Sequence, residues 1–303
     1  MSTILPINTS HVKKQFNHRG DLSSAQFLYG EIARRMIDYL KYICIKPEIL
    51  VDAGCGSGNN IQLLLKRYPK SKYIGIDHCS NLLKKAYQNF NSCFLEKFIN
   101  KFISSKFEFL EKDLANTQLP EKSIDLIWSN LALHWHSNPS QVFSEWKRIL
   151  RANGLIIFSV FGPETLREIR KAIDYGNLET NTNFFIDMHN FGDLLTRVGL
   201  FNPVLSQETL TLTYKYPEQL VKDIYLLGGN SIQNRRKNLV GRSWLKRLYS
   251  SLESQRNTSD VIPLTIEVTY GHAWGSSLSK KSNSKKSNKD IHIPISHIKK
   301  MHF

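Results

Sequence analysis

The stretch ILVDAGCGSGNN, residues 49–60, decides the fold. It begins as a short apolar run, places an acid at Asp52, and then alternates Gly54, Gly56 and Gly58 with small residues. An apolar strand that enters a glycine-rich turn allows the backbone to approach a bound ligand closely. The pattern therefore predicts a ligand site at the end of the first strand of an α/β sheet. The alternative is that the glycines only make a tight strand-to-helix turn.

The residues around the turn indicate which ligand it would bind. The dinucleotide pattern G-x-G-x-x-G requires a third glycine where this chain has Asn59, and no G-K-[ST] follows, which excludes a P-loop. The next strand ends in Asp77, and an acid at this place can bind both hydroxyls of a ribose. Asp113 follows the third strand, where it can also be a helix cap. Acids around the loop favour a ligand with a ribose and an ammonium group but no phosphate.

Strands and helices alternate on both sides of the turn. Apolar runs with turn signals predict strands, and 3.6-residue periodicity predicts helices. The expected strands are 48–54, 71–78, 106–114, 123–131, 155–162, 202–214 and 262–275, and the expected helices are 24–45, 59–69, 80–90, 137–153, 188–200, 216–231 and 241–256. The first five strands each alternate with a helix, which predicts a doubly wound, mostly parallel sheet.

Composition limits the class of protein. The chain of 303 residues has 41% hydrophobic and 22% charged residues, contains no apolar run long enough to cross a membrane, and begins without a signal-peptide pattern. Its four cysteines form no C-x-x-C pair and have no zinc spacing, so we expect a reduced, cytoplasmic protein with no metal. The net charge of +15 suits an acidic partner, or reflects a general bias to lysine.

The motifs taken in order resemble the class I S-adenosylmethionine-dependent methyltransferases. In that family the sheet ends in an antiparallel hairpin, which the last two expected strands supply. The resemblance implies that S-adenosylmethionine is the cofactor and S-adenosylhomocysteine its product. It also implies cofactor-binding roles along the loop and the strand ends, with the ribose on Asp77, the adenine by Asp113 and the backbone of Leu114, and the methionine part over Asn130 and Leu131. The remaining members of this set are Asp52, Gly54, Gly56 and Gly58.

Segments outside these motifs narrow the resemblance. AQFLYGEIARRMIDYL, DLIWSNLALHWHSNP, FSVFGPETLREIR, FIDMHNFGDLLTRVGLFNPV and IEVTYGHAWG look like the bacterial malonyl-acyl carrier protein O-methyltransferases of biotin synthesis, over roughly residues 12–275. The mitochondrial complex I assembly methyltransferase-like proteins share some of these segments. Family members usually carry an aromatic residue near the N-terminus that helps to close this segment over the cofactor. Here Leu22 or Ser23 stands near that place.

The resemblance implies methylation of the free carboxylate of a malonyl thioester. A carboxylate is ionised at pH 7, so no general base is required and no catalytic residue is assigned. The expected substrate-binding residues are His134, Trp135, Arg167 and Arg170. Alternatively, the two arginines form a solvated helix face beside Glu164 and Glu168, and His134 and Trp135 only pack their loop.

An acidic carrier protein would be the partner. A basic surface within residues 234–247 suits such a partner, and its expected members are Arg235, Arg236, Lys237, Arg242, Lys246 and Arg247. The alternative is a solvated helix face.

The implied organisation has five parts. They are an N-terminal lid and helix over 1–46, a methyltransferase core that binds S-adenosylmethionine over 47–216, a helical lid insertion over 217–260, a final core strand over 261–275, and a basic tail over 276–303 that we expect to be disordered.

Three other functions compete with this interpretation. A methyltransferase that acts on another small molecule has the same cofactor motifs. A nucleic-acid methyltransferase gains support from the charge alone, because SNLALHW stands where an N-P-P-[YF] motif would be. A complex I assembly factor-like protein would bind the cofactor without methylating a carrier protein. We expect neither nucleic acid nor membrane as a partner, and the sequence leaves the oligomeric state open.

Overall fold

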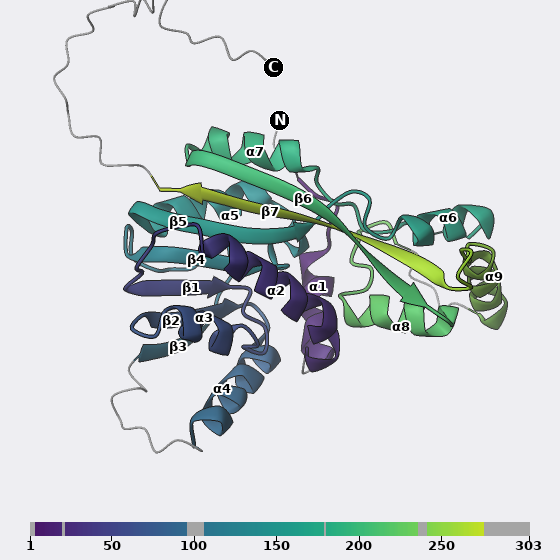
Figure 1. Ribbon diagram of the computed structural model, residues 1–303, viewed down its shortest axis with the longest axis horizontal. Helices are drawn as coiled ribbons and strands as arrows, with labels where there is room; N and C mark the ends of the chain where they lie inside the picture. Colours follow the sequence, from purple (N-terminus) through teal and green to yellow (C-terminus); the bar gives the residue numbers. More distant parts are fainter. Residues whose placement is uncertain (1–3, 20–21, 96–105, 179, 236–240, 276–303) are drawn as a thin grey trace, which may run out of the picture.

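The computed structural model describes residues 4–19, 22–95, 106–178, 180–235 and 241–275 (Figure 1). The described strands are β1 (Ile49–Ala53), β2 (Lys72–Asp77), β3 (Phe107–Glu111), β4 (Ile124–Asn130), β5 (Leu150–Phe161), β6 (Phe201–Tyr214) and β7 (Ile262–Trp274). The described helices are α1 (Thr9–Arg19), α2 (Gln26–Leu40), α3 (Ile61–Arg67), α4 (Ser80–Leu95), α5 (Pro139–Ile149), α6 (Arg167–Tyr175), α7 (Met188–Val198), α8 (Pro217–Leu226) and α9 (Arg242–Glu253), with short 3₁₀ turns η1 (Ser23–Ala25) and η3 (Leu133–Trp135).

The strands form one seven-stranded sheet in the order β3-β2-β1-β4-β5-β7-β6. The pairs from β3 to β5 are parallel, whereas β7 pairs antiparallel with both β5 and β6. This confirms the predicted doubly wound sheet with an antiparallel pair at its end. The order reverses between β1 and β4, and open α/β sheets bind ligands beyond the strand ends at such a reversal.

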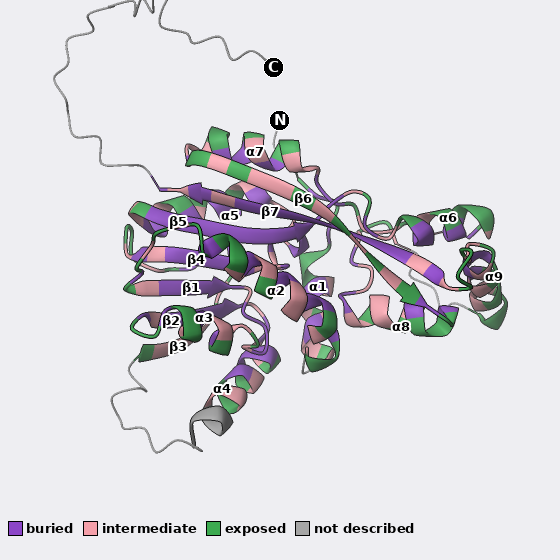
Figure 2. Ribbon diagram, in the orientation of Figure 1, coloured by how far each residue is buried: buried purple, intermediate pink, exposed green. Residues whose placement is uncertain are grey.

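Helices cover both faces of the sheet. Successive strand residues point to opposite faces, so Leu50 belongs to the core beneath α2 and α3, and Val51 to the core beneath α5 and α7. The central strands β1, β4, β5 and β7 are largely buried (Figure 2). Near-continuous apolar runs in the parallel strands reflect this two-sided burial.

The long strands β6 and β7 extend beyond the rest of the sheet and carry α6, α8 and α9 in an outer lobe (Figure 1). The N-terminal segment is attached to the chain that leaves α8. Ile7 bridges Ile232, the N–H of Asn8 donates to the carbonyl of Ser231 at 2.9 Å, and the N–H of Gln233 donates to the carbonyl of Pro6 at 2.8 Å. Among the residues described, none of the helices is long and apolar enough to span a bilayer.

Two predicted boundaries were wrong. The helix expected over 24–45 ends at Leu40. The helix expected to reach Gly154 ends at Ile149, because Leu150 is already extended and pairs with Ile124 at the start of β5. Asn153, with φ of +61°, takes the turn that we had assigned to the end of a helix. Helix α1 was not predicted, since its buried residues are just Val12 and Phe16.

Candidate active site

The glycine loop is a close-packed turn. Gly54, Gly56 and Gly58 have φ of +82°, +54° and +76°, a region that side chains disfavour. A Cβ built on Gly54 would lie 2.1 Å from the Cβ of Ala132, and one built on Gly56 would lie 2.8 Å from Cδ1 of Leu22. The loop is glycine-rich because two other segments pass directly against it.

Asp77 ties the end of β2 to this loop. Its Oδ2 accepts the backbone N–H of Gly56 at 2.9 Å, and its Oδ1 accepts that of Cys79 at 2.8 Å. The residue is 8% exposed. Each carboxylate oxygen can accept a second hydrogen bond. The carboxylate is therefore held in place with acceptor capacity left for a ligand.

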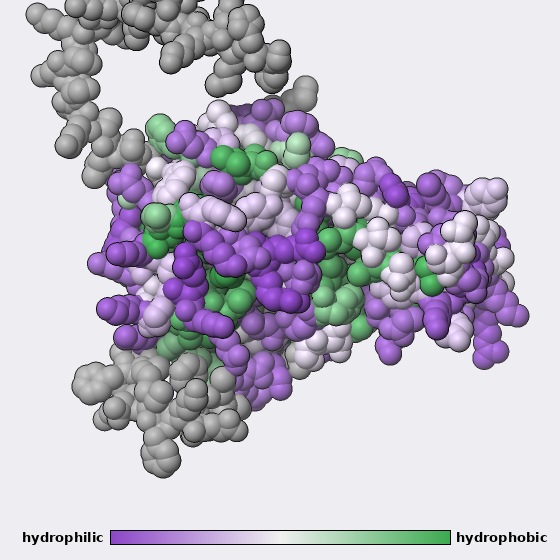
Figure 3. All heavy atoms as spheres, viewed as in Figure 1, coloured by the Kyte–Doolittle hydropathy of each residue, from purple (hydrophilic) through white to green (hydrophobic). Residues whose placement is uncertain are grey.

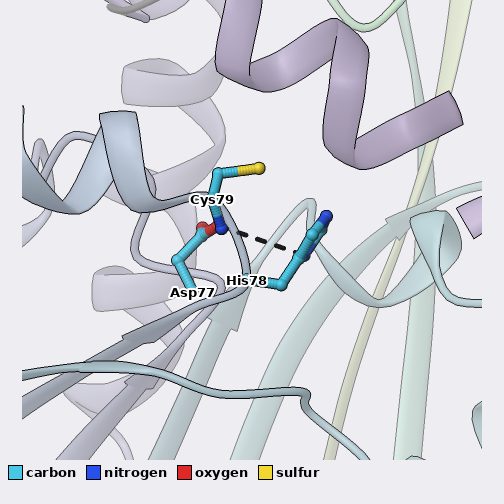
Figure 4. A group of neighbouring side chains, drawn as sticks. All are labelled: Asp77, His78 and Cys79. Atoms are coloured by element: carbon cyan, nitrogen blue, oxygen red, sulfur yellow. Dashed lines mark hydrogen bonds and ion pairs between the residues drawn. The ribbon is translucent and has the colours of Figure 1, made fainter. Parts of the chain in front are cut away.

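Asp77, His78 and Cys79 are the described residues whose ligand atoms gather closely enough to suggest a metal ion (Figure 4). They are consecutive, so the tight turn after β2 accounts for their proximity. Burial, followed by the nearby Asp77 carboxylate, raises the pKa of the Cys79 thiol. Metals bind the thiolate, so this arrangement disfavours a metal.

A cavity of about 500 Å³ opens beyond the ends of β1, β2 and β4. Its volume falls in the range of small-molecule sites. Among the residues that the sequence analysis proposed, those in its wall are Gly54, Gly56, Asp77, Asp113, Leu114, Asn130, Leu131 and Trp135. The predicted residues thus meet at one place although they lie on four separate segments.

The other side of the cavity, here called the roof, consists of Val12, Phe16, Leu22, Gln26 and Tyr29. An N-terminal lid near Leu22 or Ser23 was predicted, but the other four residues were not. Leu22 stands where the family usually has an aromatic residue, and its contact with Gly56 shows that the N-terminal segment passes over the glycine loop. Tyr29 is anchored, because its hydroxyl donates to the carbonyl of Leu227 at 2.9 Å.

Asp52 and Gly58 do not line the cavity. Asp52 is fully buried, and its Oδ2 accepts a hydrogen bond from the Tyr73 hydroxyl at 2.8 Å. Burial raises the pKa of Asp52 to about 7. Gly58 packs against Ile61 and Ala86. Both residues support the loop from beneath.

Asp113 faces a histidine that was not predicted. The ring of His136 accepts the N–H of Asn138 at Nδ1 (3.0 Å), so its Nε2 carries the proton and donates to Asp113 Oδ1 at 3.2 Å. This hydrogen bond holds the pKa of Asp113 below its usual value. Asp113 Oδ1 also accepts the N–H of Ala115 at 2.7 Å. His136 lines the cavity beside Asp113.

The end of β4 is fixed by Asn130. Its amide donates to the carbonyl of Tyr29 at 3.0 Å and accepts from the Ser159 hydroxyl at 2.9 Å. Leu131 follows with φ of +51°, a strained conformation for a leucine. The backbone thereby turns sharply into η3, which holds the next two candidates.

His134 lies outside the cavity wall. It is 3% exposed and packs against the rings of Trp135, Phe161 and Phe185. Burial lowers the pKa of His134 to about 3, so the ring is neutral at pH 7. Trp135 lines both the large cavity and a second one of about 20 Å³ beneath the outer lobe.

Arg167 and Arg170 are engaged by their own helix and its neighbours. Arg167 pairs with Glu168 at 3.1 Å and Glu164 at 3.6 Å. Arg170 donates to the carbonyls of Thr165 at 2.6 Å and Pro163 at 2.7 Å. Neither arginine lies in the wall of a described cavity, so the solvated-face alternative describes Arg167 better than a substrate role does.

The predicted basic surface divides in two. Arg235 lies against α1, where its Nη2 is 3.1 Å from Nδ1 of His11. Arg242, Lys246 and Arg247 are exposed on α9 in the outer lobe. Arg236 and Lys237 lie outside the described residues, as does the predicted tail over 276–303.

The chain is similar to known methyltransferases in sequence. A family model for methyltransferase domains matches residues 51–158. Malonyl-[acyl-carrier protein] O-methyltransferase of Nitrosospira multiformis is 34% identical over 276 residues, which covers 88% of this chain and 89% of that protein. Malonyl-[acyl-carrier protein] O-methyltransferase 1 of Coxiella burnetii is 33% identical over 270 residues, which covers 88% of this chain and 87% of that protein.

Solved structures share the fold. The YcgJ protein of Bacillus subtilis matches with a TM-score of 0.55 at 15% identity, covering 80% of this chain and 99% of that one. The phosphoethanolamine N-methyltransferase 2 of Haemonchus contortus, solved with S-adenosylmethionine, matches with a TM-score of 0.54 at 10% identity, covering 84% of this chain and 57% of that one.

Proposed function

The chain belongs to the malonyl-[acyl-carrier protein] O-methyltransferase family, and from this premise we propose that it methylates the free carboxylate of malonyl-acyl carrier protein with S-adenosylmethionine, a reaction of biotin synthesis in the cytoplasm. The observation that carries the proposal is sequence identity of 33–34% along 87–89% of the relatives' length. Matches of that extent reach well beyond the methyltransferase domain at residues 51–158, so they support a resemblance of more than the cofactor-binding part alone.

The cavity wall suits the cofactor. Asp77 would bind the ribose hydroxyls, and Asp113 with Leu114 would flank the adenine, since all three line the cavity. The glycine loop and Asn130 with Leu131 would border the methionine part. Two acids and no phosphate-binding lysine motif match a ligand with a ribose and an ammonium group but no phosphate.

The chemistry asks little of the side chains. The bound cofactor supplies a methyl group on a sulfonium, and a carboxylate is already ionised at pH 7. The residues of the chain therefore act by holding the acceptor oxygen in line and by excluding water. The carboxylate has no proton to lose, so the reaction does not require the neutral, buried His134 as a base.

We propose that the lid has two parts, the N-terminal segment within residues 1–46 and the insertion over 217–260, around a core of 47–216 and 261–275. The bridge between Ile7 and Ile232 and the bond from Tyr29 to Leu227 join these two parts beside the cavity. An acyl chain would enter between them and the end of β4.

The acidic carrier protein would dock on the lid. Arg242, Lys246 and Arg247 are exposed on α9, within an outer lobe whose surface is mainly hydrophilic on the face drawn in Figure 3. Arg235 lies closer to the roof, beside α1. Exposed basic groups would steer an acidic partner and set its orientation more than its affinity.

The first test is a transfer assay. The protein is incubated with S-adenosylmethionine that carries a labelled methyl group and with malonyl-acyl carrier protein, and the carrier is analysed by mass spectrometry. We expect one methyl group on the malonyl carboxylate and none on acetyl-acyl carrier protein, which has no free carboxylate.

Malonyl-coenzyme A in a parallel reaction distinguishes recognition of the carrier from recognition of the acyl group. An unmethylated carrier, despite measurable cofactor binding, would overturn the proposal and favour another small acceptor or a non-methylating assembly role.

A further inference from the structure

An isolated positive charge lies at the end of α1. The guanidinium carbon of Arg19 is 4.8 Å from the centre of the Phe16 ring and 5.0 Å from that of Tyr225. All three of its nitrogens are shielded from solvent and have no hydrogen-bond partner among the residues described. Buried charged groups are almost always paired and hydrogen-bonded, so this one calls for an explanation.

No carboxylate balances Arg19 in the described part of the chain. The titratable groups that face it are the hydroxyls of Tyr29 and Tyr225, and burial is the main influence that lowers the pKa of Arg19. Burial also raises the pKa of Tyr29, whose neutral hydroxyl donates away from the arginine to Leu227. Among the described residues, the guanidinium of Arg19 thus contacts the rings of Phe16 and Tyr225 but has no carboxylate partner.

Arg19 lies beside residues from the walls of both cavities, although it is in neither wall itself. Phe16 and Tyr29 belong to the roof of the large cavity, whereas Gly229 lines the small one. A Cβ built on Gly229 would be 3.6 Å from Nη2 of Arg19. Trp135 lines both cavities, packs edge-on against Phe16 with ring centres 5.5 Å apart, and has a buried indole N–H without a described partner.

Unpaired donors therefore gather on the acceptor side of the site, whereas the acids Asp77 and Asp113 lie on the cofactor side. The other arginines considered for the acceptor are occupied, Arg167 by two glutamates and Arg170 by two backbone carbonyls. Arg19 alone among these three has no protein acceptor in the described structure.

We propose that Arg19 binds the free carboxylate of the acyl group, an inference that rests on the proposed function. One oxygen of the carboxylate would contact the planar guanidinium, which suits carboxylates geometrically, and leave the other for the methyl group. The methyl ester carries no charge, so Arg19 attracts the substrate and not the product. A cation that has no carboxylate partner among the described residues would thereby favour an acyl group that ends in a carboxylate.

The test compares binding of two carriers in the presence of S-adenosylhomocysteine. Dissociation constants are measured for malonyl-acyl carrier protein and for the same carrier bearing the malonyl methyl ester, with the wild type, Arg19→Gln and Arg19→Lys. Lys14→Gln is the matched control, because it removes one positive charge from the exposed side of the same helix. Affinity for S-adenosylhomocysteine and the melting temperature are measured for each variant.

We expect the wild type and Lys14→Gln to bind the charged carrier about 10- to 100-fold more tightly than the ester, as for a hydrogen-bonded charge pair. Arg19→Gln should bind both alike, with unchanged affinity for S-adenosylhomocysteine, and Arg19→Lys should retain part of the preference. The melting temperature of Arg19→Gln should not fall, because the change removes an unpaired buried charge.

Three results would overturn the inference. The first is that Arg19→Gln prefers the charged carrier over the ester as strongly as the wild type does. The second is that the wild type shows no preference. The third is that Arg167→Gln loses the preference while Arg19→Gln keeps it. Failure of the proposed function is separate, since it would appear as a wild type that forms no methyl ester at all.

Discussion

The carboxylate of Asp77 accepts the backbone N–H of Gly56 at 2.9 Å, so the end of β2 fixes the middle of the glycine loop. Asp77→Ala removes this acceptor together with the one for Cys79 and the groups proposed for the ribose. We expect cofactor affinity to fall about 100-fold, the equivalent of one to two hydrogen bonds to a charged group. Isothermal titration with S-adenosylhomocysteine measures the change.

Asp77→Asn separates the two roles of this carboxylate. One amide oxygen can still accept a backbone N–H, so the loop should persist while the ribose contact weakens. Asp38→Asn, an exposed change on α2, is the control for loss of charge. Affinity of Asp77→Ala within threefold of wild type would contradict the proposed ribose site.

Gly54→Ala should destabilise the protein by about 2 to 4 kcal/mol for two reasons. An alanine is strained at a positive φ, and its Cβ would overpack the contact with Ala132. The built Cβ lies 2.1 Å from that of Ala132. The double variant Gly54→Ala, Ala132→Gly should recover the contact part and leave the φ part. Urea unfolding of the wild type, the two single variants and the double variant measures both, and no recovery in the double variant would show that this contact is not the cause.

Asp52→Asn should alter how stability depends on pH. The folded-state pKa of Asp52 is raised from 3.8 to about 7 by burial, so its stabilising contribution is full below about pH 4 and is lost as pH rises through about 7. The asparagine does not ionise. The free energy of unfolding of Asp52→Asn, relative to that of the wild type, should therefore rise with pH across this window, by at most about 1.4 kcal/mol per pH unit.

Urea unfolding at pH 5 and pH 8 tests the prediction for Asp52, with the exposed change Asp174→Asn as control. A difference between Asp52→Asn and wild type that is the same at both values would contradict the assigned pKa.

His134→Phe should have the opposite dependence. Burial lowers the folded-state pKa of His134 from 6.5 to about 3, so the wild type loses stability as pH falls below 6.5, by at most about 1.4 kcal/mol per pH unit. Phenylalanine suits the surrounding rings and takes up no proton. Melting curves at pH 5 and pH 8 should show a relative gain for the variant at pH 5, which the exposed change His189→Gln should not reproduce.

Local patterns were enough to predict that part of the cavity wall would form at the strand ends. Gly54, Gly56 and Asp77 follow strands that the apolar runs identify, and parallel strands bring their ends together whatever the details of packing. The antiparallel position of the last two strands came from family resemblance, since spacing alone does not determine it. The start of β5 at Leu150 was wrongly assigned to a helix, because its extended pairing with Ile124 overrides the local helix propensity.

The acceptor side could not be predicted in this way. Arg19 and Leu22 lie in a mostly polar segment whose position depends on contacts with residues some 200 positions away, such as Tyr225. Arg167 and Arg170 looked free because sequence does not reveal that carbonyls and glutamates around their own helix take up their donors. Unpaired buried atoms become visible only after the chain is folded.

The pairing of Ile7 with Ile232 has a consequence for synthesis of the chain. A ribosome delivers the N-terminal segment first, yet its pairing with the insertion cannot form until residue 232 has emerged. The glycine loop and β1 to β5 can assemble well before then, but the roof still lacks its attachments to Leu227 and Ile232. Nascent chains that stop short of the insertion would hold the glycine loop and these strands under a roof that is not yet fully attached, so we expect the capacity to retain a small ligand to mature late in translation.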